Sequence, residues 1–257
     1  MVNLIGKISK GSLMDQVYLP KNRPSAFAPG CYVELVPVLA SEKITPYFYK
    51  VGHIEPLKVE MIQTILSLAP DAGNVLICGS FLERGYGFHD IDVIVVNGSI
   101  TGVAENIEKT LGIHAHVISL DNTSLSEGLS TDPLFCMLLS KFVARKRVIF
   151  RVQRRILPRL LDLHLLSSKP LFHEFEELDG DQKYKMIRNI VAMRLFIDYR
   201  NVDSESVNKE IERLLGRGSI QNIKKNMTRK KDVLPILLKL YRKVFNHLMG
   251  EIHAQSK

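Results

Sequence analysis

Two aspartates stand two positions apart at the start of an apolar segment. Asp90 and Asp92 flank Ile91 and are followed by the valine- and isoleucine-rich stretch 93–96. Because side chains on a β-strand point alternately to opposite faces, both carboxylates are expected on one face. Neighbouring carboxylates repel each other and add little to a core, but hard divalent cations such as Mg²⁺ require such ligands. The pair therefore predicts a metal site.

A glycine–serine pair precedes the acids. The apolar stretch 75–78 ends at Gly79-Ser80, and nine residues then separate Ser80 from Asp90. This pattern predicts a buried strand, a tight turn that opens a short helix, and a second strand. Glycine lets the backbone approach a ligand closely, and the free N–H groups at the start of a helix suit phosphate. A surface hairpin with two solvated aspartates is the simpler alternative, but it does not explain the apolar strands on both sides.

The whole stretch 75–96 resembles the signature of the polymerase-β-type nucleotidyltransferases, most closely the minimal nucleotidyltransferases of archaea and bacteria. His89 stands where that family usually has a serine. The resemblance implies transfer of a nucleoside monophosphate from a nucleoside triphosphate, with ATP as the expected donor, to a hydroxyl of RNA, protein or a small molecule. It assigns Mg²⁺, or Mn²⁺ in its place, to Asp90 and Asp92. It assigns the nucleotide to Gly79, Ser80 and Arg84.

The family also carries a third carboxylate on the next strand, which completes the metal site and takes the proton from the attacking hydroxyl. In the strand expected over 113–120, His116 stands at about that position, and His114 shares its face. Histidine can accept a proton or bind a softer metal, so His116 is a candidate catalytic residue. The alternative is that the strand has lost its acid and the domain is weak or inactive. Asp121 is a less favoured substitute, and Lys141 is a further candidate contact to the nucleotide.

Residues 1–50 are expected to form a small separate β module. Strands are predicted over 16–21 and 31–36, with a turn at Pro29-Gly30 between them. The segment 16–35 is similar to the AbrB/SpoVT swapped-hairpin domain, which implies a homodimer and DNA contacts through basic side chains (Lys7, Lys10, Lys21 and Arg23). This suggests an alternative function, a catalytically degenerate regulator or antitoxin that binds DNA. A plain hairpin packed against the catalytic domain is the simpler account.

The remaining pattern predicts an α/β fold: an α+β nucleotidyltransferase core with a short mixed sheet, preceded by the β-hairpin module and followed by a helical bundle. Helices are expected over 54–69, 103–111 and 133–146, and a short strand over 148–150 closes the core of residues 51–152. The residues from 153 to 257 are predicted to be helical. One helix is expected over 183–199, and two more begin at the capping residues Asp203 and Asp232.

The formal net charge of the 257 residues is +8, which favours a polyanionic partner. Two basic clusters are candidate contacts to RNA or DNA, although such runs are most often solvated surface (Arg151, Arg154, Arg155, Arg159; Lys224, Lys225, Arg229, Lys230, Lys231). No aromatic stacking platform accompanies them in the sequence. The three isolated cysteines (Cys31, Cys78 and Cys136) are expected to be buried reduced thiols in a cytoplasmic protein. The lack of an apolar stretch of about 20 residues predicts no membrane partner.

Overall fold

The computed structural model describes residues 7–19, 21–33, 44–150 and 152–255. The chain divides into two compact units, residues 1–43 and 44–257. In the first unit, β1 (Lys7–Ser9) pairs antiparallel with β2 (Gln16–Tyr18), and a short 3-10 helix follows (Ser25–Phe27). The predicted strand over 16–21 is therefore present in its first half. Residues 31–33 lie in no strand, and the rest of the second predicted strand falls outside the described residues.

The second unit begins at Ile44, whereas the sequence predicted a boundary at residue 50. β3 (Tyr47–Tyr49) pairs antiparallel with β7 (Phe142–Ala144), and these backbone hydrogen bonds tie it to the sheet of the second unit. Residues 44–257 group together as one unit, so the further division at residue 152 stays a prediction.

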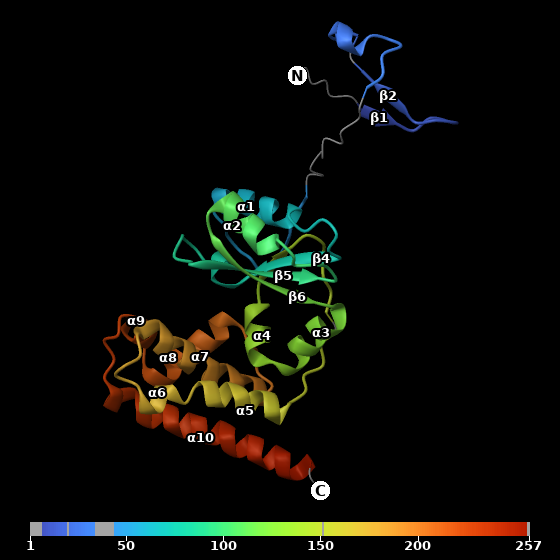
Figure 1. Cartoon of the computed structure of the whole chain (residues 1–257). Helices are drawn as coiled ribbons and strands as arrows, with labels where there is room; N and C mark the ends of the chain where they lie inside the picture. Colours follow the sequence, from blue (N-terminus) through green and yellow to red (C-terminus); the bar gives the residue numbers. More distant parts are fainter. Residues whose placement is uncertain (1–6, 20, 34–43, 151, 256–257) are drawn as a thin grey trace. The chain divides into compact units, whose positions relative to one another are not determined.

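A five-stranded mixed sheet forms the centre of the second unit, in the order β3-β7-β4-β5-β6 (Figure 1). β4 (Asn74–Cys78) runs antiparallel to β5 (Asp90–Val96), and β6 (His114–Leu120) runs parallel to β5. Parallel strands need a crossover connection, which α2 (Val103–Leu111) supplies between β5 and β6. The predicted mixed α/β class and the two central strands are confirmed.

Strand alternation divides the apolar residues of the sheet between two cores. On one face, residues such as Ile77, Val93 and Val95 pack with α1 (Pro56–Ser67) and α2. On the other face, residues such as Leu76 and Ile94 pack with α3 (Asn122–Thr131) and with the residues beyond α4 (Pro133–Leu138). Figure 1 shows α1 and α2 on one side of the sheet and α3 and α4 on the other. Because Asp90 and Asp92 are in phase with Ile94, they belong to the α3/α4 face.

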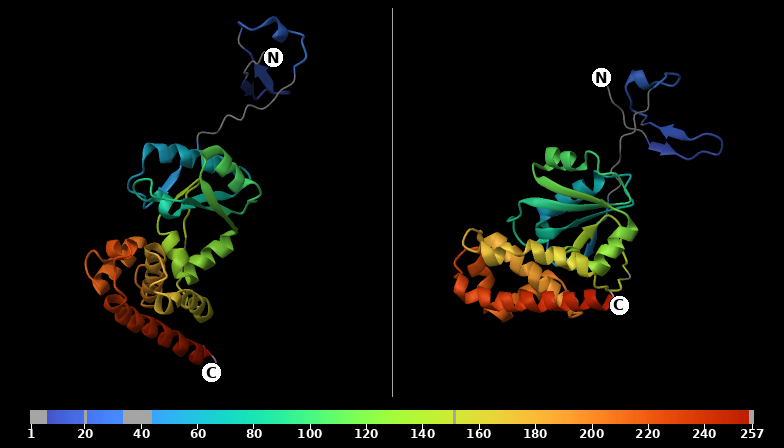
Figure 2. Two further views of the ribbon diagram at one scale, coloured as in Figure 1. Left: turned by 60° about the vertical axis from the view of Figure 1, so that its left-hand side comes forward. Right: turned by 60° about the horizontal axis from the view of Figure 1, so that its bottom comes forward.

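The remaining helices surround α7 (Gly180–Ile197), which is buried over most of its circumference, as the sequence predicted. Asp203 caps α8 by accepting a hydrogen bond from the backbone N–H of Ser206, as also predicted. Figure 2 shows α10 along the outer side of the other helices. The bounds of the helices in this part are α5 (Pro158–Ser167), α6 (Pro170–His173), α8 (Ser204–Leu215), α9 (Ser219–Lys224) and α10 (Lys230–Gln255). Within the described residues, no helix is long and apolar enough to span a bilayer.

Three local predictions were wrong. The helix expected over 133–146 stops at Leu138, and residues 142–144 form β7 instead, because this segment pairs on both sides with β3 and β4. The closing strand is therefore β7 and not residues 148–150, which form no strand. Asp232 does not cap α10, because that helix already begins at Lys230; its carboxylate instead pairs with Arg229.

Candidate functional site

The predicted site residues meet at one end of the sheet. Cys78, the last residue of β4, pairs with Asp92, so Gly79 follows directly beside the start of β5. β6 begins at the same end, where Asp92 lies opposite His116 and Asp90 lies opposite His114. The structure thus brings the glycine turn, both carboxylates and both histidines together on adjacent strands.

The carboxylate of Asp92 fills the space next to Gly79 in which a side chain at this position would lie. Gly79 has a φ of +79°, which L side chains rarely adopt, and a Cβ at this position would collide with Oδ2 of Asp92. Glycine is therefore required here for two independent reasons, the backbone conformation and the approach of the carboxylate. The contact places a polar backbone turn directly against one of the two acids.

Asp92 is held in a partly buried position. Its side chain is 27 % exposed, and neither it nor Asp90 belongs to the buried core. Burial raises the pKa of Asp92 above its usual range, and the negative charge of Asp90 raises it further, while the hydrogen bond and charge of His116 partly offset both. Two repelling carboxylates whose charge His116 offsets only in part form an arrangement that a bound divalent ion would stabilise.

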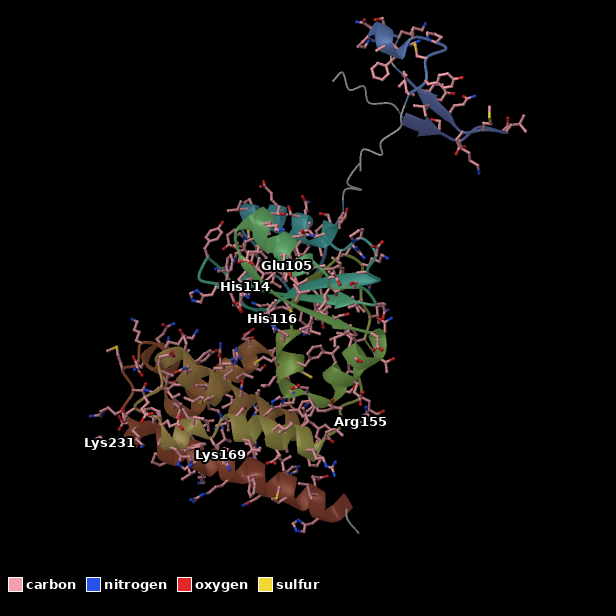
Figure 3. The ribbon with its side chains drawn as sticks, in the orientation of Figure 1. Glu105, His114, His116, Arg155, Lys169 and Lys231 are labelled. Atoms are coloured by element: carbon pink, nitrogen blue, oxygen red, sulfur yellow. The ribbon has the colours of Figure 1, made fainter. Side chains whose placement is uncertain are left out.

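His116 lies beside Asp92, with Nδ1 3.5 Å from Oδ1, and its side chain is 68 % exposed. His114 and His116 are exposed while Ala115 is buried, as strand alternation predicts. Figure 3 shows the two histidines near each other beside the sheet. Asp121 follows the opposite end of β6 and caps α3 by accepting from the N–H of Ser124 at 2.7 Å. His116, and not Asp121, therefore occupies the third position next to the acid pair.

A buried lysine that the sequence analysis missed holds the segment after Gly79-Ser80. Lys58 of α1 is fully buried, and its Nζ donates to the carbonyl oxygen of Glu83 at 2.6 Å. The same ammonium lies 3.2 Å from Oε2 of Glu55 and between 5.3 and 5.6 Å from the centroids of three aromatic rings (Phe81, Tyr86 and Phe88). A lysine charge is buried only with such compensation.

Glu55 fixes a second point of this segment, because its Oε1 accepts a hydrogen bond from the N–H of Gly85 at 2.6 Å. This bond, with further help from Lys58, lowers the pKa of Glu55 to about 2. The Glu55–Lys58 pair of α1 thereby anchors residues 83–85 next to the predicted phosphate-binding turn. A Glu and a Lys three residues apart usually form a solvated surface pair on a helix, so no sequence signal separated this pair from ordinary surface charges.

The other predicted nucleotide ligands are accessible. Ser80 lies in the exposed part of a short 3-10 helix (Gly79–Leu82), and Arg84 is exposed four residues later. Neither side chain has a hydrogen bond or ion pair with another described residue, so both are available to a ligand. Lys141 forms an ion pair with Glu83, with 2.5 Å between Nζ and Oε1. The sequence had placed Lys141 in the helix expected over 133–146. In the structure it lies outside any helix, at the edge of this turn.

Within the part of the chain that the structure describes, no group of three or more His, Cys, Asp and Glu side chains has the arrangement of a metal site. Asp90 and Asp92 supply two carboxylates, and Mg²⁺ commonly takes only one or two carboxylates from a protein, with substrate phosphates and water as the remaining ligands. The acid pair therefore fits a metal that binds together with a phosphorylated substrate.

The predicted basic clusters do not form free cationic surfaces throughout. Arg154 donates to the carbonyl oxygens of Phe196 and Arg200 and so caps the end of α7, while Arg155 pairs with Glu127 at 3.7 Å. In the second cluster Arg229 is paired with Asp232. Arg151 lies outside the described residues. The first cluster thus has a structural role in addition to its charge.

The three cysteines are free thiols, but only Cys78 is buried as predicted, because Cys136 is half-buried and Cys31 is exposed. Cys78 is buried beside the acid pair, and burial followed by the charge of Asp92 raises the pKa of its thiol far above its usual value.

Comparisons of the chain with protein-family models, with curated proteins and with solved structures give no match.

Proposed function

We propose that the protein is a metal-dependent nucleotidyltransferase that moves a nucleoside monophosphate from a nucleoside triphosphate to a hydroxyl group. The observation that carries the proposal is the contact between Gly79 and the half-buried Asp92, with Asp90 on the same strand face. A glycine turn at positive φ and a repelling acid pair at the same end of the sheet are not needed for the packing of the core. Together they suit a ligand that combines phosphate with a divalent cation.

Each residue then has a defined task. Asp90 and Asp92 would hold Mg²⁺, which when bound neutralises phosphate charge and polarises the reacting phosphoryl group. The turn at Gly79-Ser80 offers backbone N–H groups and a hydroxyl to the triphosphate, and Arg84 offers a bidentate donor. The acceptor oxygen forms a bond to the α-phosphorus, the bond to the departing pyrophosphate breaks, and neutral His116 accepts the proton of the acceptor hydroxyl. Asp92 orients His116 for that step.

The test is transfer of label from each of the four α-labelled ribonucleoside triphosphates, with Mg²⁺ or Mn²⁺, to RNA and protein acceptors. Asp90→Asn and Asp92→Asn should abolish transfer while the circular dichroism spectrum and melting temperature change little. Asp121→Asn is a matched control, because it makes the same chemical change just beyond the opposite end of β6 and asparagine is also a good helix cap. No transfer by the wild-type protein from any of the four nucleotides would overturn the proposal.

A second candidate is the DNA-binding regulator or antitoxin with a degenerate site. It is favoured by the histidine at the third position and by the independent compactness of residues 1–43. It predicts salt-dependent binding to duplex DNA that is lost when residues 1–43 are removed, a cut that leaves β3 intact. Calorimetry with ATP and Mg²⁺ separates the two candidates, because only the enzyme requires nucleotide binding that Asp92→Asn weakens.

A further inference from the structure

A pocket of about 450 Å³ opens on the α3/α4 face of the sheet, and its lining includes neither Asp90 nor Asp92. Its wall contains four aromatic rings from three separate segments. Tyr49 stacks on Phe142 with 4.9 Å between ring centroids and 24° between ring planes. Tyr47 and Phe150 contact the same phenylalanine, with centroid distances of 6.4 and 6.2 Å. Phe142 is buried and the other three rings are half-buried, so β3, β7 and the segment after β7 together supply an aromatic wall that is missing from the linear sequence.

The charges around these rings are mainly positive. Lys50, Arg147 and Arg154 line the pocket together with a single carboxylate, Asp203. That carboxylate is already occupied, because it caps α8 and accepts hydrogen bonds from Ser206 and Asn201. Arg147 is exposed and has no hydrogen bond or ion pair with any described residue, and the Nζ of Lys50 lies 5.4 Å from the centroid of the Tyr49 ring. The pocket therefore has unneutralised positive charge next to aromatic faces.

The rim of the pocket also exposes apolar side chains. Ile149 is 77 % exposed and Val152 is 46 % exposed, although both border a pocket with aromatic walls. Aromatic faces, apolar rim atoms and unpaired cations are the combination that binds single-stranded nucleic acid, because bases stack on the rings while phosphates pair with the cations. A duplex would not fit, since its bases are already stacked inside the helix.

This pocket adjoins the candidate active site. Lys50, Ser140 and Asp203 line it and also line a second pocket of about 570 Å³. The second pocket continues to Glu83 and Lys141, which border the turn at Gly79-Ser80. A strand bound with one base in the first pocket can therefore extend through the second pocket as far as Glu83 and Lys141.

We infer that the aromatic pocket binds a base near the end of a single-stranded polynucleotide. If the protein has the proposed function, on which this step rests, the terminal hydroxyl of that strand is the acceptor in nucleotidyl transfer. The excess of positive charge in the whole chain agrees with a polyanionic ligand. Binding of the strand is a property of the pocket alone and does not require the acid pair.

Binding is measured by fluorescence anisotropy with an end-labelled oligonucleotide of about ten residues, as RNA, as DNA and as a duplex of the same sequence. The full-length wild type should bind both single strands more tightly than the duplex. Tyr49→Leu keeps an apolar contact with Phe142 but removes the stacking face, and we expect binding about 5- to 150-fold weaker. Arg147→Glu should weaken binding and reduce the slope of log Kd against log salt by about 0.7 for each phosphate that the variant no longer neutralises.

Arg242→Glu is the matched control, because Arg242 is exposed on α10, outside the pocket, and has no hydrogen bond or ion pair with any described residue. It makes the same change in net charge and should leave the affinity within about twofold. The inference is overturned if Arg147→Glu and Arg242→Glu weaken binding equally, if the duplex binds as tightly as the single strands, or if free AMP binds as tightly as the oligonucleotide. Circular dichroism of each variant establishes that the fold is retained.

Failure of this inference and failure of the proposed function give different results. Asp92→Asn should bind the oligonucleotide like the wild type and lose only transfer. If the wild type transfers no nucleotide but Tyr49→Leu still weakens oligonucleotide binding, the pocket stands and the enzyme proposal fails. If transfer occurs and neither pocket variant affects binding or transfer to an oligonucleotide, the acceptor is bound elsewhere and the inference is wrong.

Discussion

The carboxylate of Asp92 fills the space that a side chain on Gly79 would need. Asp92 lies in β5, and Gly79 directly follows Cys78, the last residue of the antiparallel strand β4 and the partner of Asp92. This relationship joins the backbone turn and the acid pair into one unit, so that neither can change shape without displacing the other. It also provides a direct way to test whether their closeness matters for ligand binding.

Gly79→Ala should destabilise the fold and abolish Mg²⁺-dependent nucleotide binding. The new Cβ would force Asp92 away and would also strain the backbone at φ +79°, a conformation that costs an L residue about 1–2 kcal/mol. Gly85→Ala is the matched control, because Gly85 has a φ of +80° but open space around its Cβ position. Urea unfolding and calorimetry with ATP measure both effects. Equal losses of nucleotide binding in the two variants would contradict a specific role for the Gly79–Asp92 contact.

Lys58→Met should loosen the segment that follows the glycine turn. The change leaves the carbonyl of Glu83 and the carboxylate of Glu55 without the buried cation that they share, which should destabilise this segment. We expect faster hydrogen exchange at residues 83–86 together with weaker nucleotide binding. Lys109→Met, which removes an exposed lysine from α2, should change neither. Unchanged exchange in Lys58→Met would show that the aromatic rings hold this segment without the ammonium.

His116→Asp should increase Mg²⁺-dependent transfer, because a third carboxylate beside Asp92 suits a hard cation better than imidazole does. His116→Ala should lower any native activity by removing the proton acceptor. His114→Ala is the control, since His114 lies opposite Asp90 on the same strand face. The measurement is the rate of label transfer with Mg²⁺ and with Mn²⁺. If both His116 variants behave like the wild type, the histidine has no part in the reaction, and the degenerate-site alternative gains support.

Low pH should destabilise the folded chain by protonating Asp132, which links the start of α4 to His164 of α5. Asp132 caps α4, and its Oδ1 lies 3.1 Å from Nε2 of His164. Burial raises the pKa of Asp132, but the hydrogen bond and charge of His164, together with the backbone N–H groups of Leu134 and Phe135, outweigh burial and lower it. Since the pKa is lower in the folded state than the value of about 4 in the unfolded state, the stabilisation is complete above that pH. It is lost as the pH falls through the folded value.

Urea unfolding as a function of pH tests this expectation. Asp132→Ala should lose about 1–2 kcal/mol near neutral pH through the missing cap, and its stability should fall less steeply below pH 4 than that of the wild type. His164→Gln keeps a donor for Asp132 but has no charge, so it isolates the ionic part of the interaction. If the free energy of unfolding falls equally below pH 4 in the wild type and both variants, the pKa of Asp132 does not differ between the folded and unfolded states.

Local patterns were sufficient for much of the second unit. α2 was predicted to the residue, and β4, β5, α1 and α7 were found to within a few residues, because their apolar periodicity is strong and their ends have turn or capping residues. The common face of Asp90 and Asp92 followed from strand alternation alone. The position of His116 beside Asp92 was expected only from the family resemblance, and it depends on the parallel register of β5 and β6 that the structure provides.

Tertiary pairing decided the rest. Residues 142–144 form a strand because β3 and β4 supply hydrogen bonds from segments nearly 100 and about 65 residues earlier in the chain, and no local pattern carries that information. The same pairing brings Tyr49 against Phe142 and so creates an aromatic pocket beside Arg147. In the sequence, Lys58 looks like an exposed charge on an amphipathic helix. In the structure it is buried, with three aromatic rings around its ammonium group. Sequence alone determined which residues have the chemistry for phosphate and metal, since that depends on residue type and short spacing. Only the folded chain decided which cations stay unpaired and which aromatic faces stay open, since these depend on contacts between distant segments.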